Sequence, residues 1–184
     1  MKAIALLLSL AVLLTGYAHA SPITCPQAAV EGAEAKQFSE QHAKTYLKAM
    51  NLLFGEDNPA EAISALAPLR ASKALNTFER QAILTFLAVA HVQLEKYREA
   101  ASLLERGLHL GSSEPMGAQM RTYSNIIELY RYSDDSVSEA RILQVWSACG
   151  GDEAALLETL NRRRERCGPD ATPGSLCIKP VDVD

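Results

Sequence analysis

QAILTFLAVAHVQLEKYREAASLLERGLHLGSSEP, residues 81–115, has the pattern of one complete helix-turn-helix unit. Apolar residues recur at steps of three and four through both halves, as they do on the buried face of a helix. Tyr97 follows a short polar turn between the halves, and Gly111 and Pro115 mark the end of the second half. The stretch contains no residue set suited to catalysis, so it predicts an architecture and says little about a reaction.

The same helical character extends over the rest of the chain. Val and Ile are scattered, and Ala, Leu, Glu, Arg and Gln dominate between turn residues, which favours helix over strand. Breaks at Asn58, Asp135 and Asp152 carry helix-capping residues. We therefore expect helical segments at 36–54, 59–71, 76–94, 97–110, 115–132, 136–148 and 151–166.

The second helices of the predicted hairpins begin alike. Each of the segments PAEAISALAPL (59–69), YREAASLLERGL (97–108) and VSEARILQVWSA (137–148) has a Glu-Ala pair followed by Leu or Ile at helical spacing. Ala62, Ala100 and Ala140 recur at intervals of 38 and 40 residues, a period typical of helical solenoids. We expect an all-α solenoid of about three helix-turn-helix hairpins with a C-terminal capping helix, to which Trp146 anchors the last hairpin.

Residues 1–20, MKAIALLLSLAVLLTGYAHA, have the features of a secretory signal peptide. Lys2 precedes a short apolar run, and Ala18 and Ala20 suit cleavage before Ser21. We therefore predict a signal peptide at 1–20, an N-terminal extension at 21–37, a repeat domain at 38–167 and a tail at 168–184. The mature chain would be periplasmic or secreted, with no integral membrane span, and its 17 basic and 22 acidic residues argue against nucleic-acid binding.

All four cysteines, Cys25, Cys149, Cys167 and Cys177, follow the predicted signal peptide, and an oxidising compartment favours two disulfides. A straight helix over 151–166 would hold Cys149 and Cys167 about 22 Å apart, well beyond the roughly 7 Å limit for bridged α-carbons. We favour the pairs Cys167 with Cys177 and Cys25 with Cys149. Metal binding would need closer ligand spacing than the chain offers, so we expect no metal.

Residues 40–148 resemble the tetratricopeptide repeat (TPR) family. The best-matching unit has the family's spaced large and small packing residues at Leu84, Leu87, Ala88, Tyr97, Ala100, Leu104 and Gly107. The small residues among them would allow neighbouring helices to approach closely. The other two units match more loosely, and the spacing exceeds the family's usual 34 residues. The resemblance implies a protein-binding scaffold without a cofactor.

A narrower resemblance involves residues 75–108, the sequence ELY at 128–130 and Trp146. Together these are similar to a periplasmic repeat region in Gram-negative proteins associated with TonB energy transduction. The transducer domain and the Pro-rich spacer of those proteins are missing from this sequence. The resemblance implies an adaptor for an envelope protein, such as a partner in a TonB, ExbB and ExbD type system.

In such solenoids the first helix of each hairpin lines a concave, partner-binding groove. Residues at steps of three and four on these helices predict the groove to comprise Lys44, Leu47, Asn51, Phe54, Ala82, Thr85, Val89, Val92, Arg121, Ser124, Glu128 and Arg131. An extended peptide or helix with an apolar anchor would fit it. The alternative is a plain core face or a solvated face. The polar residues of the predicted groove argue against a core sealed from solvent.

The sequence does not predict an enzyme. His42, His91 and His109 lie in three different predicted helices without ligand spacing, and no phosphate loop or nucleophile elbow occurs. We interpret His91 as a packing residue with a satisfied hydrogen bond. The alternatives to a binding module are a self-assembling structural protein, a homodimer that depends on the surface of residues 136–148, and a small enzyme of unrecognised type.

Overall fold

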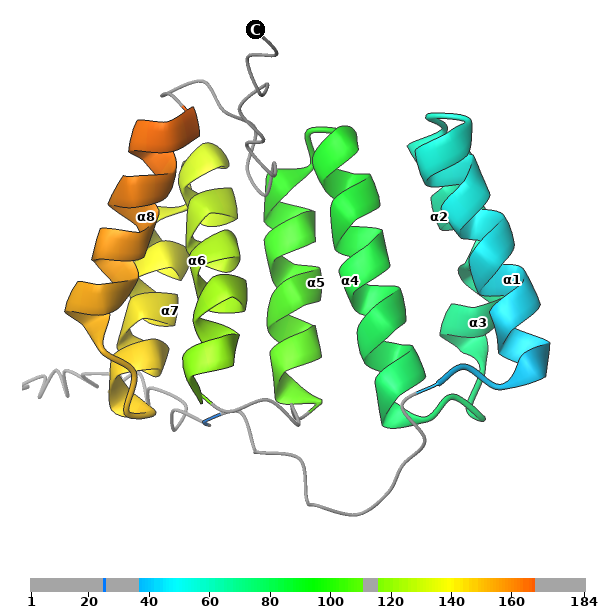
Figure 1. Ribbon diagram of the computed structural model, residues 1–184, viewed down its shortest axis with the longest axis horizontal. Helices are drawn as coiled ribbons and strands as arrows, with labels where there is room; N and C mark the ends of the chain where they lie inside the picture. Colours follow the sequence, from blue (N-terminus) through cyan, green and yellow to red (C-terminus); the bar gives the residue numbers. More distant parts are fainter. Residues whose placement is uncertain (1–24, 26–36, 111–115, 168–184) are drawn as a thin grey trace, which may run out of the picture.

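The computed structural model describes residues 25, 37–110 and 116–167 (Figure 1). Within these residues the chain is all-helical and contains no strand. The elements are α1 (Glu40–Met50), the π-helix η1 (Asn51–Gly55), α2 (Pro59–Ala65), α3 (Ala67–Ala71), α4 (Thr77–Gln93), α5 (Tyr97–His109), α6 (Met116–Tyr132), α7 (Ser136–Ala148) and α8 (Glu153–Cys167). Each of the expected helical segments is found, and the all-α fold is confirmed.

The helices stand side by side and follow one another across the molecule (Figure 1). α4 packs against α5, α5 against α6, and α6 against α7. α2 joins the first hairpin to α4, while α8 contacts both α6 and α7. Each hairpin therefore rests on its neighbours in the chain.

Local sequence explains where the helices begin and break. The side chain of Asn58 accepts a hydrogen bond from the backbone N–H of Glu61 at 3.2 Å, and Pro59 occupies the first helical position. The predicted helix 59–71 is split at Leu66, because Pro68 has no N–H to donate and its ring disfavours a continuous helix. The first helix likewise changes from α to π geometry at Asn51.

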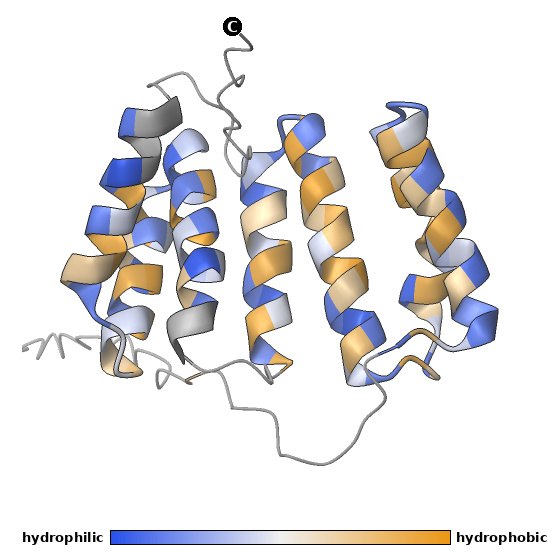
Figure 2. Cartoon of the chain, viewed as in Figure 1, coloured by the Kyte–Doolittle hydropathy of each residue, from blue (hydrophilic) through white to orange (hydrophobic). Residues whose placement is uncertain are grey.

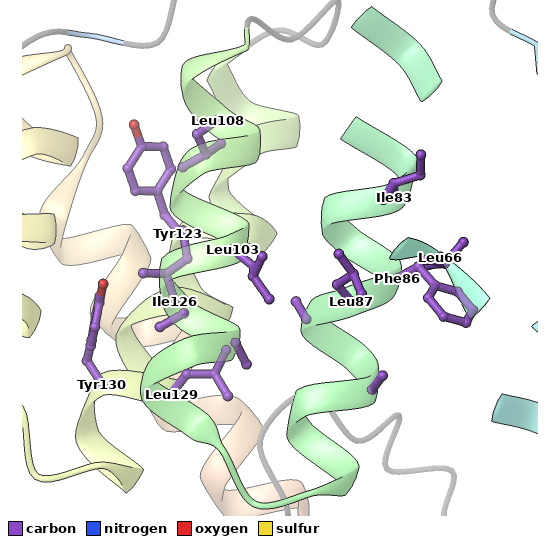
Figure 3. Close-up of a cluster of buried hydrophobic side chains, with 14 of the residues drawn as sticks. Leu66, Ile83, Phe86, Leu87, Leu103, Leu108, Tyr123, Ile126, Leu129 and Tyr130 are labelled. Carbon is purple, nitrogen blue, oxygen red and sulfur yellow. The ribbon is translucent and has the colours of Figure 1, made fainter. Parts of the chain in front are cut away.

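Apolar side chains from successive helices form one continuous core. Figure 2 shows apolar residues on every helix from α1 to α8. Figure 3 shows core side chains from the junction of α2 and α3 and from α4, α5 and α6: Leu66, Ile83, Phe86, Leu87, Leu103, Leu108, Tyr123, Ile126, Leu129 and Tyr130. The core thus extends across the hairpins, as the repeated packing positions predict.

Two of the packing interpretations are wrong. Ala62 and Ala100 are fully buried, but Ala140 is exposed. α7 begins 39 residues after α5, so Glu139 and not Ala140 occupies the position of Ala100. The buried side chain in this part of α7 is that of Ile142. Gly107 is buried, yet an added Cβ would meet no atom within 4 Å. Close helix approach therefore does not explain this glycine.

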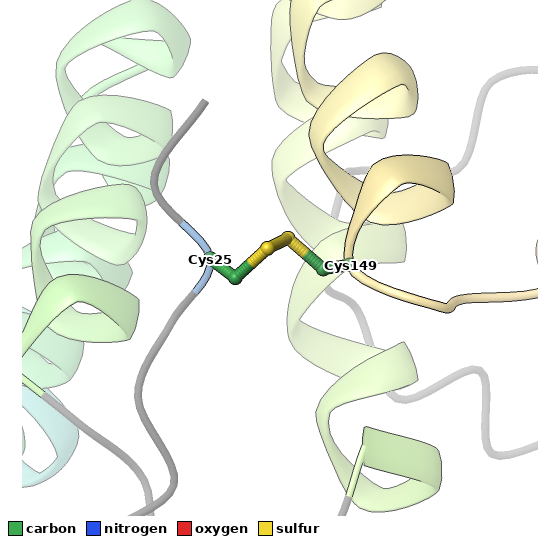
Figure 4. Close-up of a disulfide and its surroundings, with 2 residues drawn as sticks. All are labelled: Cys25 and Cys149. Carbon is green, nitrogen blue, oxygen red and sulfur yellow. A yellow bond between two sulfur atoms is a disulfide. The ribbon is translucent and has the colours of Figure 1, made fainter. Parts of the chain in front are cut away.

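A disulfide joins Cys25 to Cys149 at the C-terminal end of α7 (Figure 4). The two α-carbons lie 5.4 Å apart, so this predicted pairing is confirmed. The predicted partner of Cys167, Cys177, lies outside the described residues. So do the predicted signal peptide at 1–20, most of the 21–37 extension and the 168–184 tail. Among the helices that the structure describes, none is both long and apolar enough to cross a membrane.

Candidate binding surface

The residues predicted to line a groove lie on α1 with η1, on α4 and on α6. We call this set, without the buried Ser124, the first-helix face. Its exposed members are Lys44, Leu47, Asn51, Phe54, Thr85, Val89, Arg121 and Arg131, and its half-buried members are Ala82, Val92 and Glu128. Most of the predicted set is therefore open to solvent.

The apolar part of this face is concentrated where α1 and η1 approach α4. Leu47 and Phe54 are each 61 % exposed, and Val89 is 38 % exposed. The Phe54 ring lies with its centroid 6.1 Å from that of the buried Phe86 of α4, in an edge-on arrangement. The ring of Tyr46 on α1 also packs against Phe86, with the two ring centroids 5.6 Å apart. These contacts place the apolar side chains of two first helices on one surface.

Ser124 does not belong to this surface. Its side chain is fully buried, and its hydroxyl donates a hydrogen bond to the backbone carbonyl of Arg121 at 2.8 Å. A serine within a helix can satisfy its hydroxyl on the carbonyl of the preceding turn, so its polarity does not require solvent. The prediction that Ser124 lines the groove is wrong.

Some of the polar side chains of the face are bound within the protein. Arg131 forms an ion pair with Glu139 of α7. Asn51 donates a hydrogen bond from its side-chain amide to the carboxylate of Glu56 at 2.7 Å. Lys44 and Arg121 are exposed. The face therefore presents both apolar side chains and exposed positive charges.

A buried carboxylate, Glu79, links the start of α1 to the start of α4. It accepts hydrogen bonds from the backbone N–H of Ser39 at 2.9 Å and from that of Asn76 at 2.9 Å. The Ser39 hydroxyl donates at 3.1 Å, and His42 Nδ1 lies 2.9 Å away. Burial alone would raise the pKa of Glu79, but these hydrogen bonds outweigh burial and lower it to about 2. With its oxygens so occupied, Glu79 stabilises the fold and is not a free base.

Glu79→Gln is expected to lower the free energy of unfolding by about 3 kcal/mol at pH 6. This is the free-energy equivalent of the lowering of the Glu79 pKa from 4.5 to about 2. The pKa is depressed in the folded state, so this stabilisation is present above the ordinary value of 4.5 and is lost as the pH falls toward about 2. Urea unfolding at pH 6 and at pH 2.5 measures both effects. The difference in free energy of unfolding between wild type and variant should narrow at pH 2.5. The control Glu99→Gln, at an exposed position, should change the free energy of unfolding little at either pH.

A second polar cluster links three successive helices. Arg141 of α7 donates to both carboxylate oxygens of Glu105 on α5, with Nη2 2.8 Å from Oε2. The Tyr130 hydroxyl of α6 donates to the same carboxylate at 3.0 Å. Burial favours a higher pKa for Glu105, yet the hydrogen bonds from Arg141 and Tyr130 lower it. Such a satisfied network fixes the hairpins to one another and leaves no reactive group.

The environment of His91 corrects another prediction. Its Nδ1 is buried and has no hydrogen-bond partner within the described part of the chain, so this ring nitrogen lacks the expected hydrogen bond. Burial lowers the pKa of His91, and the nearby positive charge of Lys96 lowers it further. Among the described residues, no group of His, Cys, Asp or Glu side chains could hold a metal ion.

The chain matches no protein-family model. Comparisons with curated proteins and with solved structures give no significant match either.

Proposed function

We propose that this protein is an exported interaction module with a TPR-like solenoid arrangement, and that its first-helix face binds a helix or extended peptide of another envelope protein. The observation that carries the proposal is the 61 % exposure of both Leu47 and Phe54. Full burial of such side chains is worth about 1.5–3 kcal/mol each, so a partner that covers them gains affinity from both.

Charge and chemistry narrow the kind of partner. Lys44 precedes Leu47 by one helical turn, and Arg121 is exposed on α6. A partner segment with an apolar anchor and acidic flanks would complement this arrangement. The Cys25–Cys149 disulfide suits an oxidising compartment, which supports an envelope setting. The sequence resemblance favours a partner from a TonB, ExbB and ExbD type system.

Site-specific photo-crosslinking in intact cells tests this proposal. Probes at Phe54 and Val89 are expected to capture one and the same protein, and a probe at the exposed Glu99 of α5 should not. The captured protein's crosslinked segment, made as a peptide, should then bind the purified chain. Phe54→Ser should weaken that binding at least about tenfold, as expected for a central apolar anchor.

Self-assembly is the competing function, and one surface favours it. Val137 of α7 is 79 % exposed and Tyr132 at the end of α6 is 41 % exposed. A third crosslinking probe at Val137 distinguishes the two functions. Capture of only a second copy of this chain, from Val137 and not from Phe54, would overturn the interaction-module proposal in favour of a homodimer.

A further inference from the structure

A pocket of about 380 Å³ lies between α3, the first turns of α4 and the end of α5. It is lined by Ala67, Arg70, Ala71, Leu75, Arg80, Ile83, Leu84, Arg106 and Leu110. At 100° per residue, the α4 members of this lining lie on the opposite side of the helix from Thr85 and Val89. The pocket is therefore separate from the first-helix face.

Three arginines line the pocket, and none of its lining residues within the described part of the chain is acidic. Arg70 and Arg106 occupy the last turns of α3 and α5, where positive charge complements the helix dipole. The dipole does not account for Arg80, which lies near the N-terminus of α4, where a cation is disfavoured. The chain as a whole has a net charge of −4, so the cluster is not part of a generally basic surface.

Arg80 is held in place by the backbone around it. Its Nε donates to the carbonyl of Leu75 at 3.1 Å, and its Nη2 donates to the carbonyl of Lys73 at 3.2 Å. A guanidinium has five N–H donors, so this pair of bonds leaves donors for a ligand. Because its position is fixed in advance, Arg80 loses less side-chain entropy on binding than a mobile arginine would.

The remaining lining is mostly apolar. Leu75 and Ile83 are buried at 8 % and 3 % exposure, Leu84 is half-buried, and Leu110 is 37 % exposed. An apolar wall with a few convergent polar groups is the usual composition of a small-molecule site, and the volume falls at the lower end of the roughly 300–1,000 Å³ range of such sites. The pocket is too small to take a folded helix.

We propose that this pocket binds an anionic amphiphile, in which a carboxylate or phosphate head group pairs with Arg70, Arg80 and Arg106 and a short apolar chain contacts the leucine and isoleucine walls. Arginine recognises both head groups through paired N–H donors. The apolar lining supplies the part of the affinity that an inorganic anion cannot obtain. This site is independent of the partner surface proposed above.

Calorimetric titration of the oxidised protein with a matched set of ligands tests the site. The probes are decanoate, decyl phosphate, decanol and inorganic phosphate. Decanoate or decyl phosphate is expected to bind at least about tenfold more tightly than either decanol or inorganic phosphate, because only the amphiphiles engage both parts of the pocket. Binding of inorganic phosphate as tight as that of decyl phosphate would overturn the amphiphile assignment and leave a simple anion site.

Charge-removing variants separate this pocket from other surfaces. Arg70→Gln combined with Arg106→Gln changes two exposed side chains and leaves the hydrogen bonds of Arg80 intact. This double variant should weaken amphiphile binding at least about tenfold, and Lys48→Gln on α1 should bind as the wild type does. Unchanged binding in the double variant, or no binding of any amphiphile to the wild type at millimolar concentration, would overturn the proposal.

Discussion

Replacing Cys25 and Cys149 together by serine is expected to lower the free energy of unfolding by about 5 kcal/mol. The disulfide joins residues 124 positions apart. In the chain-entropy account, a cross-link that closes a loop of that size removes about 5 kcal/mol of conformational freedom from the unfolded chain. The bond also holds Cys25 at the end of α7, so its loss releases Cys25 from that helix.

Urea unfolding followed by circular dichroism measures this loss. The matched control is Cys167→Ser with Cys177→Ser, which removes the other predicted disulfide. That link would close a much shorter loop, so its removal should cost less stability. A loss below about 1 kcal/mol in the Cys25 and Cys149 variant would contradict the assigned role of this bond, and so would equal losses in the two variants.

Much of the fold could be predicted because its determinants are local. Asn58 and Asp152 cap helices where the sequence indicates a break, and the breaks alone locate most of the helices. The exclusion of a Cys149–Cys167 disulfide followed from a single length, because the final helix begins shortly after Cys149 and ends at Cys167. Each of these inferences needs only helical geometry and a short stretch of chain.

The register of the third hairpin could not be predicted in the same way. The Glu-Ala pair that ends at Ala140 resembles the pair that ends at Ala100, but the helix start shifts the buried face by one residue. One residue rotates a helix by 100°, which moves Ala140 from the core to the solvent. The burial of Ser124 shows a related limit, because a helix can satisfy a hydroxyl internally.

Two polar features of the structure depend on residues far apart in the sequence. The capping pattern at Asn76 and Glu79 is visible in the sequence, but the contributions of Ser39 and His42 come from about 40 positions away. The arginine-lined pocket likewise combines residues from three helices. No periodic pattern links such residues, so the structure was needed to find them.

Trp146→Ala is expected to lower the free energy of unfolding by about 4 kcal/mol, as other buried large-to-small aromatic changes do. The indole is 1 % exposed and packs against the Tyr123 ring with centroids 4.8 Å apart. Its Nε1 donates to the carbonyl of Asp152 at 2.9 Å, just before α8 begins. A Cβ added at Gly151 would lie 2.2 Å from the ring, so the chain entering α8 passes directly over the indole. The single side chain therefore joins α6, α7 and the start of α8.

Thermal unfolding followed by circular dichroism tests this role. Tryptophan fluorescence is unsuitable, because the variant lacks the only tryptophan of the chain. A loss of about 4 kcal/mol corresponds to a fall in Tm of roughly 10 °C for a protein of this size. Trp146→Phe keeps an aromatic ring but removes the hydrogen bond to Asp152, and should cost about 1–2 kcal/mol. If Trp146→Ala and Trp146→Phe lose the same small amount, the ring does not hold α8 against the preceding hairpin. A large loss in the alanine variant with a small one in the phenylalanine variant would instead show that ring packing contributes more than the hydrogen bond.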